Sequence, residues 1–268
     1  MKQAILSLVL MLTVFCSSQL MAQNSKYLSI DQLNVPLDAA TTIDSSNGGK
    51  LSYFVYMDIA MRSSESLTAL RNLYAAVAEN RQLNLSVKTV DINGKAVEER
   101  FYQAAAVQEI ILPVIDGADK NLIKVHVKIR STSLSVKENS GSVPSTGLTR
   151  ATPAINSNFR LSLGALPVKR VAKIGAIRIA PGQVSSFSLE LSEQDAKDWQ
   201  NWLISNPSKR ESGAIEWMAA NFKDPLFQID LRDLEITSTS TQFTNTETRT
   251  ISRLTVGLRG KVIPGGGK

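Results

Sequence analysis

The chain has little of what most catalytic and metal centres are built from. It contains one cysteine, Cys16, and one histidine, His126, among 268 residues. A single histidine cannot form a multi-histidine metal site, and without another histidine the many serines lack their usual general base. There is no Gly-x-Ser-x-Gly motif, and the glycine-rich stretches match no phosphate-binding loop. We therefore predict that the protein is not an enzyme and has no catalytic residue, cofactor or metal ion.

Long runs of like charge are also absent. No stretch of five or six like-charged residues occurs, so the chain has no tail typical of nucleic-acid-binding proteins. The net charge is +6, but the basic residues are spread along the chain, which favours solubility and gives only weak affinity for anionic surfaces. The hydrophobic content of 43% is enough for a buried core. We expect a globular protein without a specific nucleic-acid partner.

The N-terminal segment Met1–Ala22 has the features of a secretory signal peptide. Lys2 supplies a positive charge, residues 4–15 are apolar, and the small residue Ala22 suits a cleavage site. The apolar run is too short to span a bilayer comfortably, and an uncleaved anchor is the alternative. We predict export to the periplasm or the exterior, with Cys16 removed, so that the mature chain has no disulfide. No later segment reaches membrane-spanning length without charges, so we expect no transmembrane segment in the mature chain.

Two polar stretches divide the rest of the chain. Residues 23–50 are polar and rich in small side chains, which is typical of a loose N-terminal arm. Residues 136–158 contain Ser, Gly and Pro in the pattern of an exposed linker, and a long loop within one domain is the alternative. We therefore expect one β domain over 51–135, a second over 159–263, and a flexible tail over 264–268.

Alternating apolar residues and turn signals predict antiparallel strands in both halves. Asn93-Gly94 favours a tight hairpin turn, so residues 83–92 and 96–106 should pair. A further apolar strand is expected to begin in residues 110–115. Residues 123–130 alternate between apolar and basic side chains, which places His126 on a solvent-exposed basic face. In the second half, residues 237–250 are rich in Thr and Ser and predict a long exposed hairpin.

Each half also contains one amphipathic helix. In the first half, Ser63, Ser64 and Ser66 are candidate N-caps. The apolar face of that helix comprises Leu67, Leu70, Leu73, Tyr74 and Val77.

The second helix has its own start and stop signals. Ser192 is a good N-cap, Glu193 and Asp195 favour the positive end of the helix dipole, and Asn206-Pro207 ends the helix. Trp199 and Trp202 lie at core spacing on this helix. We therefore expect packing in the interior rather than a sugar-stacking platform built with Trp217.

One acidic cluster, formed by Asp230, Asp233 and Glu235, is the only candidate for an enzyme active site that the sequence offers. A metal site or a pair of catalytic carboxylates is conceivable there. Strand alternation puts Asp230 on the opposite face from the other two, so we expect solvated surface charge instead. Glu98-Glu99 is likewise expected to be surface charge.

The two halves share a pattern of residues at a fixed separation. Leu70-Arg-Asn-Leu73-Tyr74 matches Trp199-Gln-Asn-Trp202-Leu203 in apolar spacing, and both copies close on a strand that ends in arginine. The copies extend over residues 67–130 and 196–259, and coincidence of two ordinary β-rich patterns is the alternative. We predict a mainly β (α+β) protein with two similar antiparallel small β-barrel or sandwich domains, each with one flanking helix.

This pattern resembles the phage tail-tube proteins and the related hemolysin-coregulated tube protein of type VI secretion. The resemblance rests on the helix that ends near Glu79, on Asp91-Ile-Asn-Gly94, on Phe101-Tyr-Gln-Ala-Ala and on the strand 124–130, with a similar order in the second half. It covers roughly residues 50–135 and 160–263, and its motifs are patterns of apolar positions of low specificity.

The resemblance implies a structural role without catalysis. Members of the family form rings of six small β-barrel domains, and the rings stack into a tube. A tandem copy would imply a homo-oligomer of three chains, which keeps closed symmetry. Our hypothesis is an exported protein that works by self-association or with protein partners. The alternative is a secreted binding module for carbohydrate or protein, using exposed aromatics such as Tyr53, Tyr56 or Trp217.

Overall fold

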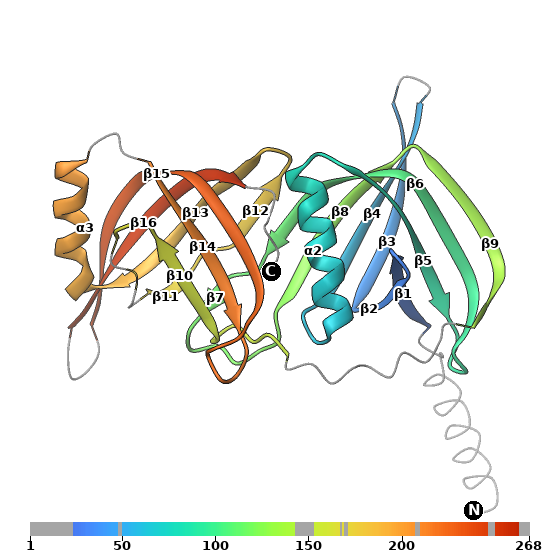
Figure 1. Ribbon diagram of the computed structural model, residues 1–268, viewed down its shortest axis with the longest axis horizontal. Helices are drawn as coiled ribbons and strands as arrows, with labels where there is room; N and C mark the ends of the chain where they lie inside the picture. The colour runs from blue at the N-terminus through green and yellow to red at the C-terminus, as the bar shows by residue number, and fades with distance from the viewer. Residues whose placement is uncertain are drawn as a thin grey trace, which may run out of the picture.

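The computed structural model describes residues 24–47, 50–142, 153–166, 168, 171–206, 210–245 and 250–262. These residues form a mainly β protein in which every pair of neighbouring strands is antiparallel, as predicted (Figure 1). The predicted signal peptide, the C-terminal tail and Pro207 lie outside the described residues.

Among the described residues, the first half of the chain contributes nine strands. They are β1 (Ser25–Ile30), β2 (Leu33–Leu37), β3 (Ala39–Asn47), β4 (Lys50–Ala60), β5 (Gln82–Val90), β6 (Lys95–Leu112), β7 (Ile115–Asp116), β8 (Lys124–Ser131) and β9 (Ser133–Ser142). The second half contributes β10 (Phe159–Leu163), β11 (Val171–Ile174), β12 (Ile177–Ala180), β13 (Gln183–Ser192), β14 (Glu211–Met218), β15 (Pro225–Asn245) and β16 (Thr250–Val262).

Strand pairing follows the same order in both halves. In the first half the order is β1-β5-β6-β8-β4-β3, and β9 continues beside β6 where β8 stops. In the second half the order is β10-β14-β15-β16-β13-β12, and β11 also pairs with β13. One helix lies between β4 and β5 in the chain, and the other lies between β13 and β14.

Helix α2 (Ser64–Ala78) begins where its capping residues predict. Ser63 is the N-cap, and its side chain accepts a hydrogen bond from the Ser66 backbone N–H at 3.2 Å, while the Ser66 hydroxyl accepts from the Ser63 N–H. The predicted apolar face is buried: Leu67, Leu70, Leu73, Tyr74 and Val77. This face packs on the sheet of the first half.

Helix α3 (Glu193–Ser205) has a weaker start. Ser192 is its N-cap residue, as predicted, but the Ser192 side chain makes no capping hydrogen bond. Asn206 ends the helix, and its side-chain amide donates to the Trp202 carbonyl at 3.0 Å. Trp199 is fully buried, which confirms its predicted place in the core.

In the described residues, the edge strand β12 of the second half pairs with the end of β6, beyond the last β5–β6 pair, and joins the two halves into one sixteen-stranded sheet. Ile177–Ile179 of β12 pairs with Ile110–Leu112 at the end of β6, and we call this pairing the internal joint. β11 also pairs with β7 beside it. Buried apolar side chains from both halves form one continuous cluster across this boundary.

Helix α2 reinforces the boundary between the halves, where Figure 1 shows it standing next to the second half. The Tyr74 hydroxyl donates a hydrogen bond to the Asp230 backbone carbonyl at 3.1 Å. The Arg71 guanidinium donates to the Leu226 carbonyl, on the same segment of β15. The Tyr74 ring also packs edge-on against Phe227, with 6.3 Å between ring centroids.

Three boundary predictions are wrong in part. The expected loose arm at 23–50 contains β1, β2 and β3, because β1 pairs with β2 and with the distant β5, and β3 pairs with the next strand in the chain, β4. The expected linker at 136–158 begins too early, because β9 runs to Ser142 beside β6. Residues 110–112 do not begin a new strand, because they end the long strand β6.

The predicted hairpins are confirmed. Residues on either side of Asn93-Gly94 pair as β5 and β6, and Gly94 has the positive φ of 77° that the turn requires. β15 and β16 pair up to Asn245 and Thr250, and residues 237–241 are exposed.

Candidate functional site

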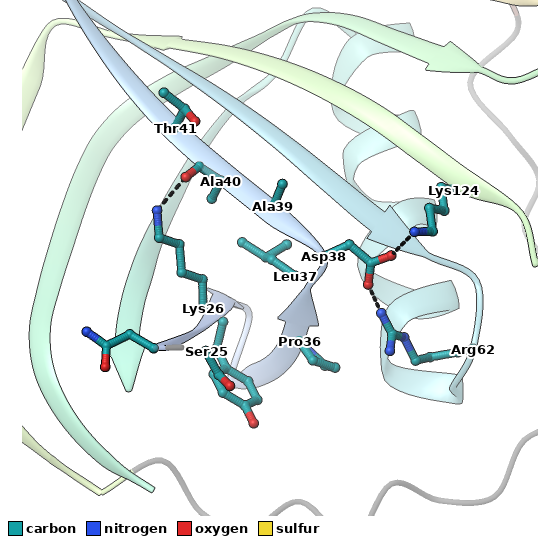
Figure 2. Close-up of a pocket in the computed structure, with 12 residues that line it drawn as sticks. Ser25, Lys26, Pro36, Leu37, Asp38, Ala39, Ala40, Thr41, Arg62 and Lys124 are labelled. Carbon is teal, nitrogen blue, oxygen red and sulfur yellow. Dashed lines mark hydrogen bonds and ion pairs between the residues drawn. The ribbon is translucent and has the colours of Figure 1, made fainter. Parts of the chain in front are cut away.

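A polar cavity of about 620 Å³ lies at the corner between β1, β2 and β3 (Figure 2). Three cationic side chains, Lys26, Arg62 and Lys124, and one carboxylate, Asp38, contribute to its lining. Lys26 comes from β1, Lys124 from the start of β8, and Arg62 directly precedes the N-cap of α2.

Asp38 connects three elements at this corner. Its carboxylate pairs with the Arg62 guanidinium through one oxygen and with Lys124 Nζ at 2.9 Å through the other. The Asp38 backbone N–H donates to the Asp58 carbonyl at 2.9 Å, which fixes the carboxylate over β4. Figure 2 shows both cations pointing toward Asp38, whereas Lys26 points toward the Ala40 carbonyl, which it contacts at 2.5 Å.

The arrangement around Asp38 is that of a structural clamp. A carboxylate shared by two cations is a poor general base, because both cations favour its ionised form. The lining residues include no His or Cys, so the cavity offers no thiol or imidazole for catalysis. The net positive charge of the lining would suit an anionic group. However, Arg62 and Lys124 already pair with Asp38, and Lys26 contacts the Ala40 carbonyl.

A second depression, which we call the β5–β6 groove, lies in the same half. It has a volume of about 820 Å³ and is lined by Ser29, Asn84, Leu85, Ser86, Glu99, Phe101, Tyr102, Gln103, Ala104 and Ser135. Glu99 is only 6% exposed there. Its carboxylate accepts a hydrogen bond from the Ser86 hydroxyl at 2.6 Å and lies 3.6 Å from Lys88 Nζ.

Glu99 corrects the prediction that Glu98-Glu99 is surface charge. Strand alternation puts Glu99 on the face opposite the main core, but side chains of the neighbouring strands cover it there. Lys88 and Lys137 lie directly opposite Glu99 on either side. Glu98 is half-buried and pairs with Arg100 at 2.7 Å, and this hydrogen bond raises the pKa of Arg100. Sequence reasoning missed the groove because its residues come from four strands.

The structure places the histidine where the sequence predicts. The His126 side chain is 53% exposed on β8, and its Nδ1 lies 2.5 Å from Asp58 Oδ1. Within the described ranges, no three His, Cys, Asp or Glu side chains are grouped so that they could hold a metal ion.

Each carboxylate of the acidic cluster has its own interaction partner. Asp233 pairs with Lys261 at 3.3 Å and Glu235 with Arg259 at 3.1 Å, both across the β15–β16 ladder. The Asp230 carboxylate instead accepts from the Gln228 side chain at 2.6 Å. The predicted split over two faces of the strand is wrong. The ladder shifts register between Arg232 and Glu235, where Asp233 has a positive φ of 51°, so Leu231 and Leu234 are both buried and the side chains of Asp230 and Glu235 both lie on the outer face.

The aromatic side chains named as sugar-binding candidates divide into buried and exposed ones. Trp217 is fully buried, so the prediction of an exposed Trp217 is wrong, and its interior packing is confirmed. Trp202 and Tyr53 are half-buried. Tyr56 is 39% exposed, and Lys128 Nζ lies 5.5 Å from the centroid of its ring.

Among the described residues, no helix has the length and apolar character needed to cross a membrane. No protein-family model matches the chain, and no curated protein is significantly similar to it.

Proposed function

We propose that the protein is an exported, non-enzymatic structural protein that assembles with copies of itself. The internal joint carries this proposal, because it pairs an edge strand of one half with the end of a strand of the other half, beyond that strand's last pair with β5, and each half could form such a contact with a neighbouring molecule. The resemblance to tail-tube subunits and the shortage of catalytic side chains support the same role.

The shared order of strand pairing supports the view that the two halves are copies of one unit. Six strands and one helix occur in the same order in both, and all six pair antiparallel. If the halves are equivalent, the internal joint is the contact of one unit with the next. Each chain then has two free surfaces: one unit offers the counterpart of β12, and the other unit offers the counterpart of the end of β6. Two neighbouring chains could form the same pairing through these surfaces.

The pairing registers locate these two open ends. In the first half, the last β5–β6 pair is Gln82↔Ala106, and the residues that pair with β12 begin four residues later on β6, at Ile110. The strand of the second half that corresponds to β6 is β15. Its last pair with β14 is Glu211↔Leu234, and four residues later is Ser238. On β12, the three residues that pair with β6 are Ile177–Ile179, and one further residue, Ala180, ends the strand. The strand of the first half that corresponds to β12 is β3, which ends at Asn47, so the equivalent three residues are Asp44–Ser46. We therefore place the contact between Ser238–Ser240 of one copy and Asp44–Ser46 of the next.

Both segments are available for pairing. No described strand other than β4 pairs with β3, and β15 beyond Leu234 pairs only with β16. Ile43, beside the β3 segment, is 51% exposed. Unpaired strand edges are templates for strand addition, and exposed apolar side chains beside them mark a contact surface.

Such a contact is head-to-tail, so it either closes into a ring or grows into a filament. A ring of six units would contain three chains. The first test is the solution mass of residues 23–268, measured by light scattering over a range of concentrations. A trimer or a multiple of three supports the proposal, whereas a monomer at every concentration contradicts it.

A cysteine cross-link tests the position of the contact. In a Cys16→Ser background, Asp44→Cys is combined with Thr239→Cys or with Ser240→Cys, because neighbouring residues of a strand point to opposite faces. Mild oxidation should give a ladder of linked chains for one of the two pairs. Each single-cysteine variant is the matched control and can form no species larger than a dimer. An oligomeric protein without a ladder would place the contact elsewhere.

A further inference from the structure

The β5–β6 groove combines polar and aromatic side chains in one row across four strands. Ser29 of β1 lies opposite Ser86 of β5, which lies opposite Phe101 of β6, which in turn lies opposite Ser135 of β9. A row of this kind presents hydroxyl groups on both sides of one ring. None of the groove residues belongs to β3 or β15, so the groove is separate from the proposed assembly contact.

Fixed amide and carboxylate groups lie next to this row. Asn84 Oδ1 accepts from the Ala104 backbone N–H at 3.0 Å, which sets the orientation of the amide and directs its NH₂ group elsewhere. Ala104 has a positive φ of 46°, and the ladder shifts register between Leu83 and Leu85, so a bulge bends the strands at this point. The exposed side chain of Gln103 directly precedes Ala104 on β6.

The groove lining carries one negative charge, and Lys88 and Lys137 flank it on the neighbouring strands. Glu99 is the only charged residue of the lining, and Lys88 lies 3.6 Å from it. A buried carboxylate that already accepts from Ser86 keeps lone pairs for further hydroxyl donors. A ligand that offers hydroxyl groups and carries no negative charge fits these groups.

Phe101 supplies an apolar surface among the polar groups. The ring is half-buried, and neighbouring Tyr102 is 1% exposed, with its hydroxyl 2.7 Å from that of Thr42. Pyranose rings present one face of C–H bonds and a rim of hydroxyls, so they suit a site with one aromatic ring and several polar side chains. The volume of about 820 Å³ lies within the range of small-ligand sites.

We infer that the β5–β6 groove is a binding site for a neutral oligosaccharide. One sugar ring stacks on Phe101, and its hydroxyl groups bond to Glu99, Asn84 and Gln103. The site differs from the aromatic residues that the sequence pointed to, because Tyr56 lies on β4 and Trp217 lies in the core.

The test is calorimetric titration of the full chain with cellotetraose, laminaritetraose, mannotetraose and chitotetraose, and with an acidic hyaluronan tetrasaccharide. At least one neutral probe should bind, and the acidic probe should bind more weakly. Phe101→Ala should weaken binding about tenfold, which corresponds to the loss of one stacking contact. Gln103→Ala, at an exposed position, should weaken it several-fold without disturbing the fold.

Tyr56→Ala is the matched control, because it removes an exposed aromatic ring outside the groove and should leave the affinity unchanged. The inference fails if no neutral probe binds at millimolar concentration, if the acidic probe binds best, or if both groove variants bind as the wild type does. Loss of binding in Tyr56→Ala alone would move the site to the face of β4. These results do not depend on the oligomeric state.

Discussion

Removal of the Tyr74 hydroxyl tests the contact between helix α2 and the second half. Tyr74 is 4% exposed, and its only described hydrogen bond goes to the Asp230 carbonyl at 3.1 Å. Burial raises the pKa of Tyr74 far above its usual value, because the phenolate would lie in the apolar interior. Tyr74→Phe keeps the ring and its packing against Phe227 and deletes only the hydroxyl.

The size of the effect depends on pH in a defined direction. At pH 7 the variant loses one buried hydrogen bond, which lowers the free energy of unfolding by about 1 kcal/mol. The folded wild type keeps the Tyr74 proton above pH 10, where the unfolded chain releases it, so wild-type stability is complete below about pH 10 and falls above it. This single group costs the wild type about 1.4 kcal/mol by pH 11. Tyr74→Phe has no phenol at this position and loses no stability in this way. The difference in free energy of unfolding between the two proteins should therefore close near pH 11.

The assay is urea unfolding followed by circular dichroism at pH 7, 9, 10 and 11. Tyr56→Phe, at an exposed position on β4, is the control and should match the wild type at pH 7 within about 0.5 kcal/mol. Burial also raises the pKa of Tyr102, so part of the alkaline loss remains in the Tyr74 variant. A gap at pH 11 as large as the gap at pH 7 would refute the reasoning, because Tyr74 would then ionise equally in both states.

Three further substitutions test local features of the fold. Ser63→Ala should lower the free energy of unfolding by about 1 kcal/mol, whereas Ser192→Ala should change it by less than about 0.5 kcal/mol, because only Ser63 makes a capping hydrogen bond; urea unfolding checks both. Gly213→Ala should cost about 1–3 kcal/mol in the same assay, since a Cβ there would lie 2.1 Å from the Ser162 carbonyl oxygen across the β10–β14 ladder. Trp217→Ala should cost about 3–5 kcal/mol and remove near-ultraviolet dichroism, and a loss below about 1 kcal/mol would contradict its burial.

Local signals in the sequence predicted the local structure well. The serines before α2, the Asn93-Gly94 turn and the alternation in β8 each depend on residues close together in the chain, so spacing alone identifies them. The fully buried Trp199 follows the same rule, because helical spacing fixes its face.

Contacts between residues far apart in the chain could not be predicted from the sequence. β1 looks like part of a loose arm, because nothing local shows that β5 will pair with it. β3 is different, because it pairs with the next strand, β4, on either side of Gly48-Gly49, and the interpretation as an arm overlooked this local hairpin signal. The burial of Glu99 depends on side chains from neighbouring strands, so strand alternation alone assigns it to solvent. The internal joint could not be predicted for the same reason, since β12 and β6 lie far apart in the sequence.

The chemistry of the two edges predicts how strong self-association will be. The internal joint is apolar: Ile110, Leu112, Ile177 and Ile179 are all at most 3% exposed. The segments that we propose for the contact between chains are instead Ser238–Ser240 and Asp44–Ser46, which carry Ser, Thr and Asp side chains.

Backbone hydrogen bonds can form equally well at both places, but burial of apolar side chains contributes about 25 cal/mol per Å² at the internal joint and little between chains. The contact between chains should therefore be reversible, with oligomers that dissociate on dilution while each chain stays folded. Replacing Ser240 with Ile adds an apolar side chain at this edge and should shift the light-scattering mass toward the oligomer at a given concentration. An unchanged mass in Ser240→Ile, together with an oligomeric wild type, would show that the chains associate through a different surface.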